Sequence, residues 1–476
     1  MQPTGGEVDI VSMRIFLLLS FTVAATGCTK TNPNLCCTTE AGCASIGIPV
    51  GSDCASGLVC RGNQCIAESC GTSSDCDAAA PYCKTTCVEA CTEDTQCPGF
   101  GDDVANIYCV SGGCVACRQN ADCPANENVC DAGSCRGCMK NSECASAVCN
   151  TISATCAAET SVMYATPDGA ASGACTQTEP CTATFALASA TAARAIVKLA
   201  NGTYDGFIFD ISDGRVVTVV GDQSTLKNSG SPAGIKSSTL RMRDVTWDQT
   251  QMHCLPTVGG MIPTVELDNV TFLSTAYLLA SNCNLIIRNS HVLSENNGPI
   301  VTCNAGSTCL IDSTVFDQSP MGVFEHSTLT MTNCVFTNAG TNGALEYAGL
   351  DDNSSNSISF STFYNSKLAC VRGTNQFQLS SNIFVNALPG APIDTVTGSG
   401  CTHAYSLVTP QTTSIGATDK LNLDPLFAAP TTADFHLQPG SLAIDAANPT
   451  STLGTDFDGI ARPQGAARDM GAFEHH

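Results

Sequence analysis

Two pairs of closely spaced aspartates have a spacing that could support catalysis or metal binding. Asp351 and Asp352 are adjacent in the segment GLDDNSSN, and Asp456 and Asp458 belong to the segment DFDG. Two carboxyl groups across a glycosidic bond can act as general acid and base, although adjacent aspartates in a Gly- and Asn-rich segment are also typical of a solvated turn. Calcium takes about six to eight oxygen ligands. We therefore take Asp351 and Asp352 as candidates for ligand contact, and Asp456 and Asp458 as candidates for calcium.

The aspartates near the C-terminus also have a structural interpretation, in which they pair with Arg462 and Arg468 and lock the end of the fold. The aspartates concerned are Asp445, Asp456, Asp458 and Asp469. Five histidines are scattered through the second half of the chain without a metal-ligand spacing such as i, i+4. They are His253, His291, His326, His403 and His436. The sequence predicts no cofactor, and among carboxylate-bound metal ions calcium is the one with candidate ligands.

Arg241 and Arg243 form the only basic pair on the repeated segments described below. Guanidinium groups bind carboxylates through paired hydrogen bonds, so these two residues are candidates for contact with an acidic polymer. The whole chain is acidic, with 20 Lys and Arg against 43 Asp and Glu and a net charge of -23. This charge repels nucleic acid. The sequence therefore predicts no nucleic-acid partner, and favours a polysaccharide or another surface protein.

A repeated eight-residue segment indicates how these residues are positioned. Its copies end on a large apolar residue, and these end residues are 20 to 27 positions apart: Leu240–Trp247, Val265–Phe272, Leu285–Val292, Cys309–Phe316, Leu329–Phe336, Asn356–Phe363 and Phe377–Phe384. A fixed period of this length is typical of a solenoid. A β-sandwich is the alternative, but its short hairpin connections do not keep one register at a fixed period. About seven to nine stacked rungs are expected.

The fifth residue of each copy breaks the apolar alternation of a strand. It is Asp244, Asn269, Asn289, Ser313 or Asn333, whereas Phe360 and Ser381 depart mildly from the pattern. Short polar side chains tolerate left-handed backbone angles and bond nearby amides. We interpret this residue as a corner, after which the last residue of the segment points inward again.

Cysteines dominate the first part of the chain, where 23 of the 32 lie between Cys28 and Cys156. From Cys70 a four-cysteine unit recurs four times, always opening with C-x5-C and with a polar residue before its second cysteine. Without Cys28 the number is even, and eleven disulfides of undetermined connectivity are expected for an exported chain. The spacings Cys114-x2-Cys117 and Cys135-x2-Cys138 leave zinc as the alternative.

Nine further cysteines follow the repeats, so at least one has no partner within this part of the chain. Cys175 and Cys181 are expected to close a loop, and Cys303 and Cys309 to flank a short turn. Cys254 with Cys283, and Cys370 with Cys401, lie about one rung apart. Cys334 remains and falls at an inward position of its rung, so we predict a buried free thiol.

The N-terminus has the layout of an export signal. From Met13, the expected true start, one basic residue precedes an apolar run and then small residues, too short for a membrane span. The segment ends in ATGC, which resembles the lipobox of bacterial lipoproteins. The resemblance implies cleavage after residue 27 and acylation of Cys28, hence attachment to a lipid bilayer. An ordinary secretory signal is the alternative. Because Thr29 rather than Asp follows Cys28, the lipobox resemblance implies attachment to the bacterial outer membrane, at the cell surface or facing the periplasm.

Three resemblances extend this interpretation over most of the chain. The cysteine units resemble the cysteine-rich repeats that bacterial surface proteins place before a larger domain. The rungs, preceded by GACTQTEPC and the expected capping helix in ATFALASATAA, resemble the right-handed parallel β-helix of the pectin-lyase-like superfamily. The C-terminal stretch from Asp434 to Glu474 resembles the ending of the β-helical surface proteins called choice-of-anchor Q, with GS, DFDG, RP and DMGAFE in place.

These observations predict an all-β chain, a right-handed single-stranded parallel β-helix preceded by a disulfide-rich stalk. The expected parts are a signal peptide at 1–27, a cysteine-rich region at 28–160 and the β-helix with its cap and C-terminal motif at 161–476. Of the motifs of β-helical glycosidases and lyases, only Asp351-Asp352 is present. The favoured function is a non-catalytic, lipid-anchored surface protein for adhesion or glycan contact. The alternative is a polysaccharide lyase or glycoside hydrolase with a divergent active site.

Overall fold

The computed structural model describes most of the chain from residue 108 onward and parts of the chain before it. The described residues are 58–61, 64–67, 82–84, 86–88, 90–97 and 108–476, except 208, 228–229, 231, 250, 257–259, 274–275, 295–299, 305, 320, 325–326, 339–344, 349–355, 367, 371–376, 387–395, 399–400 and 414. The signal segment, Cys28, His326 and the pair Asp351 and Asp352 lie outside them. The chain divides into two compact units, Met1–Arg136 and Gly137–His476.

The cysteine-rich modules are small antiparallel hairpins. In the first unit these are β1 (Leu58–Arg61) with β2 (Gln64–Ala67), β3 (Tyr82–Lys84) with β4 (Thr86–Val88), β5 (Tyr108–Val110) with β6 (Gly113–Val115), and β7 (Val129–Asp131) with β8 (Ser134–Arg136). The last module, with β9 (Cys149–Asn150) and β10 (Thr155–Cys156), belongs to the second unit. Such short hairpins bury little apolar surface and depend on cross-links.

Disulfides join the first cysteine of a module to the third and the second to the fourth. The pairs are Cys91–Cys109 with Cys97–Cys114, Cys117–Cys130 with Cys123–Cys135, and Cys138–Cys149 with Cys144–Cys156. The zinc alternative is therefore wrong for these modules, because the cysteines at zinc-type spacings are all oxidised. The polar residue before the second cysteine closes a 3-10 turn. Gln96, Asp122 and Glu143 each accept two backbone N–H groups from the residues three and four positions earlier.

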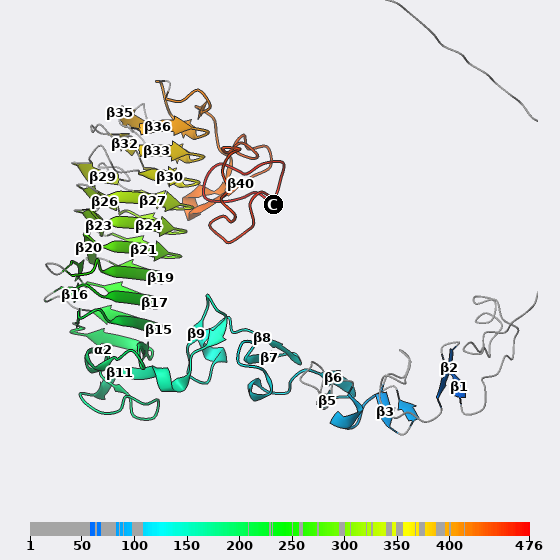
Figure 1. The fold of residues 1–476 in the computed structure, drawn as a ribbon. Helices are drawn as coiled ribbons and strands as arrows, with labels where there is room; N and C mark the ends of the chain where they lie inside the picture. Colours follow the sequence, from blue (N-terminus) through cyan, green and yellow to red (C-terminus); the bar gives the residue numbers. More distant parts are fainter. Residues whose placement is uncertain are drawn as a thin grey trace, which may run out of the picture. The chain divides into compact units, whose positions relative to one another are not determined.

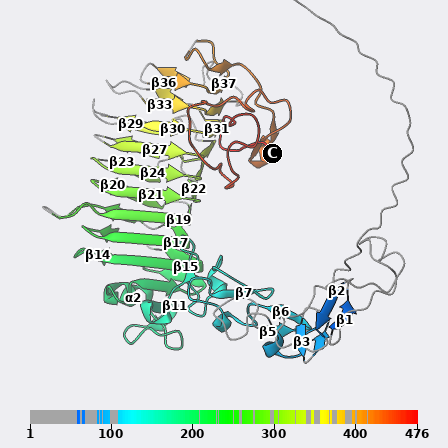
Figure 2. The same cartoon turned by 45° about the vertical axis from the view of Figure 1, so that its right-hand side comes forward.

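The second unit contains a parallel β-helix, seen as stacked strands in Figures 1 and 2. Its large sheet has 19 strands: β11 (Val162–Ala170), β12 (Ile196–Leu199), β13 (Gly202–Asp205), β15 (Val216–Lys227), β17 (Thr239–Asp248), β19 (Thr264–Leu273), β21 (Asn284–Arg288), β22 (His291–Leu293), β24 (Thr308–Asp312), β25 (Val315–Asp317), β27 (Thr328–Thr332), β28 (Val335–Thr337), β30 (Ser357–Ser359), β31 (Thr362–Tyr364), β33 (Phe377–Ser380), β34 (Ile383–Val385), β36 (Cys401–Ala404), β37 (Leu407–Thr409) and β38 (Lys420–Leu421). Wherever consecutive rungs pair in this sheet they do so in parallel, which confirms the expected all-β solenoid.

A smaller sheet forms another side of the helix and has seven strands. They are β14 (Asp210–Ile211), β16 (Ala233–Ile235), β18 (Gln251–Cys254), β20 (Tyr277–Ser281), β23 (Val301–Asn304), β26 (Met321–Phe324) and β29 (Leu345–Ala348). A two-stranded parallel sheet of β32 (Leu368–Cys370) and β35 (Val396–Gly398) follows later in the chain. Apolar side chains from the large and the seven-stranded sheets fill one continuous core.

The corner residues have the left-handed backbone conformation that the sequence predicts. The angle φ is 59° at Asp244, 53° at Asn269, 50° at Asn289, 46° at Ser313 and 51° at Asn333. Phe360 and Ser381, which depart from the polar rule, have φ of 50° and 62° and make the same turn. The corner is therefore a requirement of the backbone at this position of the rung, and Asn or Asp meets it at the least cost.

The last residue of each rung points into the core and forms a column. Phe316, Phe336, Phe363 and Phe384 are each fully buried, with neighbouring ring centroids 4.5, 4.9 and 4.5 Å apart and the rings nearly parallel. Trp247 stacks in the same way on Phe272. Such stacking is a direct consequence of parallel, in-register strands, which place identical rung positions above one another.

A short α-helix covers the first rungs of the β-helix at one end, and a C-terminal segment packs along its side. Helix α2 (Ala183–Ser189) begins at Thr182, whose side chain caps it, and buries Ala183, Ala186 and Leu187 against the core. The C-terminal segment contains β39 (Phe427–Ala429) and β40 (Asp434–Leu437) and packs on the outside of β31 and β34, where Figure 2 shows its red coil. The backbone N–H of Ala472 donates to Thr362 Oγ1 at 3.0 Å. The segment thus shields one side of the last rungs.

The cysteines of the helix fall into pairs and one single thiol. Disulfides join Cys175 to Cys181, Cys254 to Cys283 and Cys303 to Cys309. Cys401 is also disulfide-bonded. Among the described residues Cys334 is a free cysteine, fully buried, with its Sγ 3.2 Å from the carbonyl oxygen of Thr332.

We predict that Cys334 does not react with a maleimide in the native protein. Burial raises the pKa of this thiol far above its usual range, and thiolates are the reactive form. Unfolding in denaturant without reductant should then allow labelling of Cys334, detected by mass spectrometry and peptide mapping. Labelling of Cys334 in the native state would contradict its place in the core.

Candidate functional site

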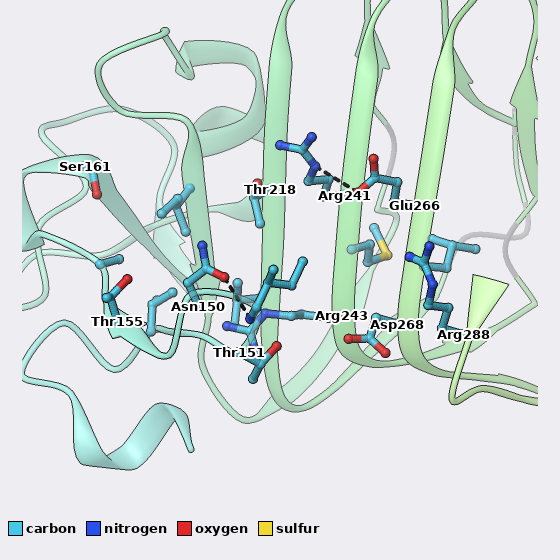
Figure 3. A pocket seen from close by; sticks show the side chains of 17 residues that line it. Asn150, Thr151, Thr155, Ser161, Thr218, Arg241, Arg243, Glu266, Asp268 and Arg288 are labelled. Carbon is cyan, nitrogen blue, oxygen red and sulfur yellow. Dashed lines mark hydrogen bonds and ion pairs between the residues drawn. The ribbon is translucent and has the colours of Figure 1, made fainter. Parts of the chain in front are cut away.

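A pocket with a volume of about 380 Å³ lies between the last cysteine module and the outward face of the large sheet, all within the second unit (Figure 3). The module contributes its β9–β10 hairpin, which includes Asn150 and Ile152. The sheet contributes alternate, outward-pointing residues of β15, β17, β19 and β21. The charged lining residues are Arg241, Arg243, Glu266, Asp268 and Arg288. Its volume falls in the range of about 300–1,000 Å³ typical of small-molecule sites.

Arg241 is the more accessible of the two arginines singled out in the sequence. Its Nε lies 2.9 Å from Glu266 Oε2, and its side chain remains 51% exposed. Ion pairs of this exposure contribute little to stability, about 0–1 kcal/mol. The guanidinium can therefore exchange its partner for a ligand carboxylate at low cost.

Arg243 has a structural use that the sequence did not indicate. Its guanidinium pairs with Asp244 at 2.8 Å, donates to Asn141 Oδ1 at 3.0 Å and donates to the carbonyl oxygen of Cys149. The side chain is only 15% exposed. Since its donors are engaged by the cysteine module, Arg243 fastens that module to the helix and forms the base of the pocket. Arg243 thus lines the pocket as a structural residue, and its contact with a ligand stays a prediction.

Arg288 is the pocket residue that sequence reasoning missed. In the strand register Arg288 lies between Asp268 on the preceding rung and Asp312 on the following rung. Asp268 is in turn the register neighbour of Arg243. The fourth position of consecutive rungs thus reads Arg243, Asp268, Arg288, Asp312, and this alternation was visible in the aligned segments. Arg288 is exposed and makes no ion pair within the part of the chain that the structure describes. Figure 3 shows Arg288 beside Asp268, with Arg288 on β21 and Asp268 on the neighbouring strand β19.

The aspartates considered for calcium are engaged by the protein itself. Asp456 accepts the backbone N–H groups of Asp458, Ile460 and Glu474. Asp458 pairs with His436. Among the described residues, the groups of three side chains close enough to share a metal ion consist of cysteines that are in disulfides. Asp456 therefore shapes the C-terminal turn.

Among the described residues, the C-terminal aspartates form no direct ion pair with Arg462 or Arg468, although the charges of Asp456 and Asp469 oppose the lowering of the Arg462 pKa by burial. Arg462 forms a fully buried ion pair with Glu474, at 2.8 Å, and Arg468 donates to the carbonyl oxygen of Leu453. Asp445 and Asp469 accept backbone N–H groups instead. Carboxylates at such turns bond the nearest amides, which are fixed by the local chain path and need no side-chain partner.

His436 ties two parts of the C-terminal segment together. Its ring nitrogens lie 2.7 Å from Asp434 Oδ1 and 2.8 Å from Asp458 Oδ2. Burial lowers the pKa of His436, but the hydrogen bonds and charges of the two aspartates outweigh burial and raise its pKa above the ordinary 6.5. A raised folded pKa means that the imidazolium stabilises the fold fully below pH 6.5, and that this stability is lost as pH rises through the folded pKa.

We predict that hydrogen exchange of the amides in Asp434–Leu437 becomes faster as the pH rises above about 6.5, beyond the intrinsic pH dependence of exchange. The variant His436→Gln should lose this extra dependence, because glutamine carries no titrating charge. The variant His403→Gln is the matched control, since burial lowers the pKa of His403 to about 4 and leaves it neutral across this pH range. An unchanged pH dependence of exchange in His436→Gln would contradict the stabilising role of the His436 imidazolium.

No family model matches this chain, and no curated protein matches it in sequence. Among solved structures, the pectate lyase Pel9A is similar over 66% of this chain and 96% of its own, with 16% identity and a TM-score of 0.34. A rhamnogalacturonan lyase is similar over 56% of this chain and 90% of its own, with 11% identity and a TM-score of 0.34.

None of the helices that the structure describes is long and apolar enough to cross a membrane.

Proposed function

We propose that this protein binds a uronate-containing saccharide on the outward face of its β-helix and does not convert it chemically. The observation that carries the proposal is the pocket in which Arg241 and Arg288 stand beside Glu266 and Asp268 at the spacing of neighbouring strands. Arginine offers a planar fork to a ligand carboxylate. Glutamate and aspartate accept hydrogen bonds from the hydroxyl groups of a sugar. A sugar acid presents both kinds of group within one ring.

The apolar part of the lining supports the same ligand class. Ile152 of the cysteine module is 95% exposed and borders the pocket, whereas the lining residues Val148 and Val220 are themselves buried beneath it. One face of a sugar ring carries C–H groups and packs on such side chains. A nucleic acid, which carries a charged phosphate at every nucleotide, would meet the repulsion of Glu266, Asp268 and the chain's net charge of -23.

The rigid scaffold suits display of such a site. The two disulfides of the last module, Cys138–Cys149 and Cys144–Cys156, and the docking of that module through Arg243 hold the walls of the pocket in place. Preorganisation of this kind lowers the entropy lost on binding. We include in the proposal the export of the chain and its attachment to the bacterial outer membrane through an acylated Cys28. Replacement Cys28→Ser should release the protein from the membrane fraction, and its retention there would contradict lipidation.

A glycan array read together with an assay for unsaturated uronate products tests binding against catalysis. The proposal expects retention on uronate-containing oligosaccharides and no accumulation of unsaturated product. The variant Lys236→Gln removes an exposed cation that pairs with Asp210 outside the pocket, and serves as the control. Product formation that is abolished by Arg288→Gln or Glu266→Gln, but not by Lys236→Gln, would make the protein a lyase and overturn the proposal.

A further inference from the structure

A second pocket, with a volume of about 340 Å³, opens around the corner of the rungs, where the C-terminal segment meets the large sheet. It is lined by corner residues and outward residues of β19, β22 and β25 and by one aromatic ring of the C-terminal segment: Asn269, Thr271, Asn289, Ser290, His291, Ser313, Val315 and Phe457. None of these side chains is a carboxylate, lysine or arginine. The lining therefore differs in kind from that of the arginine pocket.

The polar groups of this second pocket are held in fixed orientations. Asn269 Nδ2 donates to Asp244 Oδ1 at 2.9 Å, and Asn289 Nδ2 donates to Asp268 Oδ1 at 2.7 Å. These bonds fix both amides and leave their Oδ1 atoms as acceptors. Burial lowers the pKa of His291, against the smaller effect of Asp317, so its imidazole is neutral at neutral pH and offers both a donor and an acceptor.

Phe457 supplies a rigid aromatic face. Its backbone N–H donates to the carbonyl oxygen of Ala472 at 2.9 Å, and its ring packs at 5.1 Å from that of Phe473. The neighbouring Asp456 carboxylate holds the turn by three backbone hydrogen bonds. The ring is nonetheless only half-buried and borders the pocket. A fixed aromatic face beside neutral donors and acceptors matches the C–H face and hydroxyl groups of a sugar ring.

We infer that this pocket is a subsite for a neutral saccharide, in which the sugar ring packs on Phe457 and its hydroxyl groups bond His291, Asn269 and Asn289. The two pockets adjoin in the chain, because Asp268 and Arg288 line one and the next residues, Asn269 and Asn289, line the other. A polymer that alternates acidic and neutral sugars could occupy both. Only this last step rests on the proposed uronate site; the neutral subsite stands on its own residues.

The test titrates the full chain with neutral oligosaccharides (gluco-, galacto-, manno- and xylo-tetraoses) and, separately, with a uronate tetramer, by calorimetry and saturation-transfer NMR. The inference expects one neutral series to bind. Phe457→Leu, which keeps an apolar residue in the C-terminal core, and His291→Ala should each weaken that binding at least about tenfold, with uronate binding unchanged. Tyr277→Leu removes a half-exposed aromatic ring from the other sheet and should change neither affinity.

Each alternative outcome has a separate meaning. Absence of binding by every neutral series, or neutral binding that is insensitive to both Phe457→Leu and His291→Ala, would overturn the neutral subsite. Loss of uronate binding in Arg288→Gln with intact neutral binding would support both sites. Intact neutral binding without any uronate binding would refute the proposed function and leave the neutral subsite standing.

Discussion

Replacement of Arg462 by methionine should destabilise the C-terminal segment by about 3–5 kcal/mol, the loss typical when one partner of a buried ion pair is removed. The side chains of Arg462 and Glu474 are both 0% exposed, and the guanidinium also donates to the carbonyl oxygens of Asp469 and Gly471. Burial lowers the pKa of Arg462, while the Glu474 carboxylate opposes this effect. Without the arginine, Glu474 would remain as a buried, uncompensated charge.

Urea unfolding measured by circular dichroism, with hydrogen exchange at Met470 and Ala472, would measure this loss. Arg468→Met is the matched control, because Arg468 is half-buried and one hydrogen bond of its Nε should contribute about 0.5–1.5 kcal/mol. The double variant Arg462→Met with Glu474→Met should recover part of the loss, since it removes both charges. A loss for Arg462→Met no larger than that for Arg468→Met would show that the ion pair does not hold the segment.

Replacement of Phe336 by alanine should have a comparable effect on the β-helix itself. The ring is fully buried and stacked between Phe316, at 4.5 Å, and Phe363, at 4.9 Å. Its removal leaves a cavity in the middle of a column that parallel strands cannot close without shifting register. The expected loss is about 3–5 kcal/mol, measured as a lower midpoint of urea unfolding followed by the fluorescence of Trp247.

Two control variants separate packing from other effects at this rung. Phe336→Leu keeps most of the volume and should cost less than about 1.5 kcal/mol. Thr330→Ala changes an outward, half-exposed residue of the preceding strand and should stay within about 0.5 kcal/mol. Equal midpoints for Phe336→Ala and Thr330→Ala would mean that Phe336 does not lie in the core.

The rungs could be predicted from the sequence because their geometric requirements recur with a period. Parallel stacking repeats the same demands at the same position, so Asp244, Asn269, Asn289 and Asn333 show the corner by their residue type. The corner of β15 is Gln223, with φ of 52°, and carries no such sign. The corner can be recognised in the sequence only where it is occupied by a residue type that tolerates left-handed backbone angles. Its place in the rung is set by the fold.

The candidate sites could be predicted only in part, because each combines a rung with a segment far away in the sequence. Arg241 was recognised by type, and Arg288 was recognisable from its alignment with Arg243. The engagement of Arg243 by Asn141 and Cys149 required knowledge of where the last cysteine module packs. The approach of Phe457 to the corners of β19 and β22 likewise depends on the return of the C-terminal segment along the helix. No local pattern encodes either contact.

The most direct measurement of the central claim is a calorimetric titration of the whole protein with a uronate tetramer and with the same tetramer after reduction of its carboxyl groups. The account predicts binding of the acidic tetramer that weakens with added salt, as expected for an exposed charge pair. The reduced tetramer should bind at least about tenfold more weakly, and Arg288→Gln should weaken the acidic tetramer by a similar factor. Equal affinities for the two tetramers, or an unchanged affinity in Arg288→Gln, would contradict the claim that this pocket binds a sugar acid.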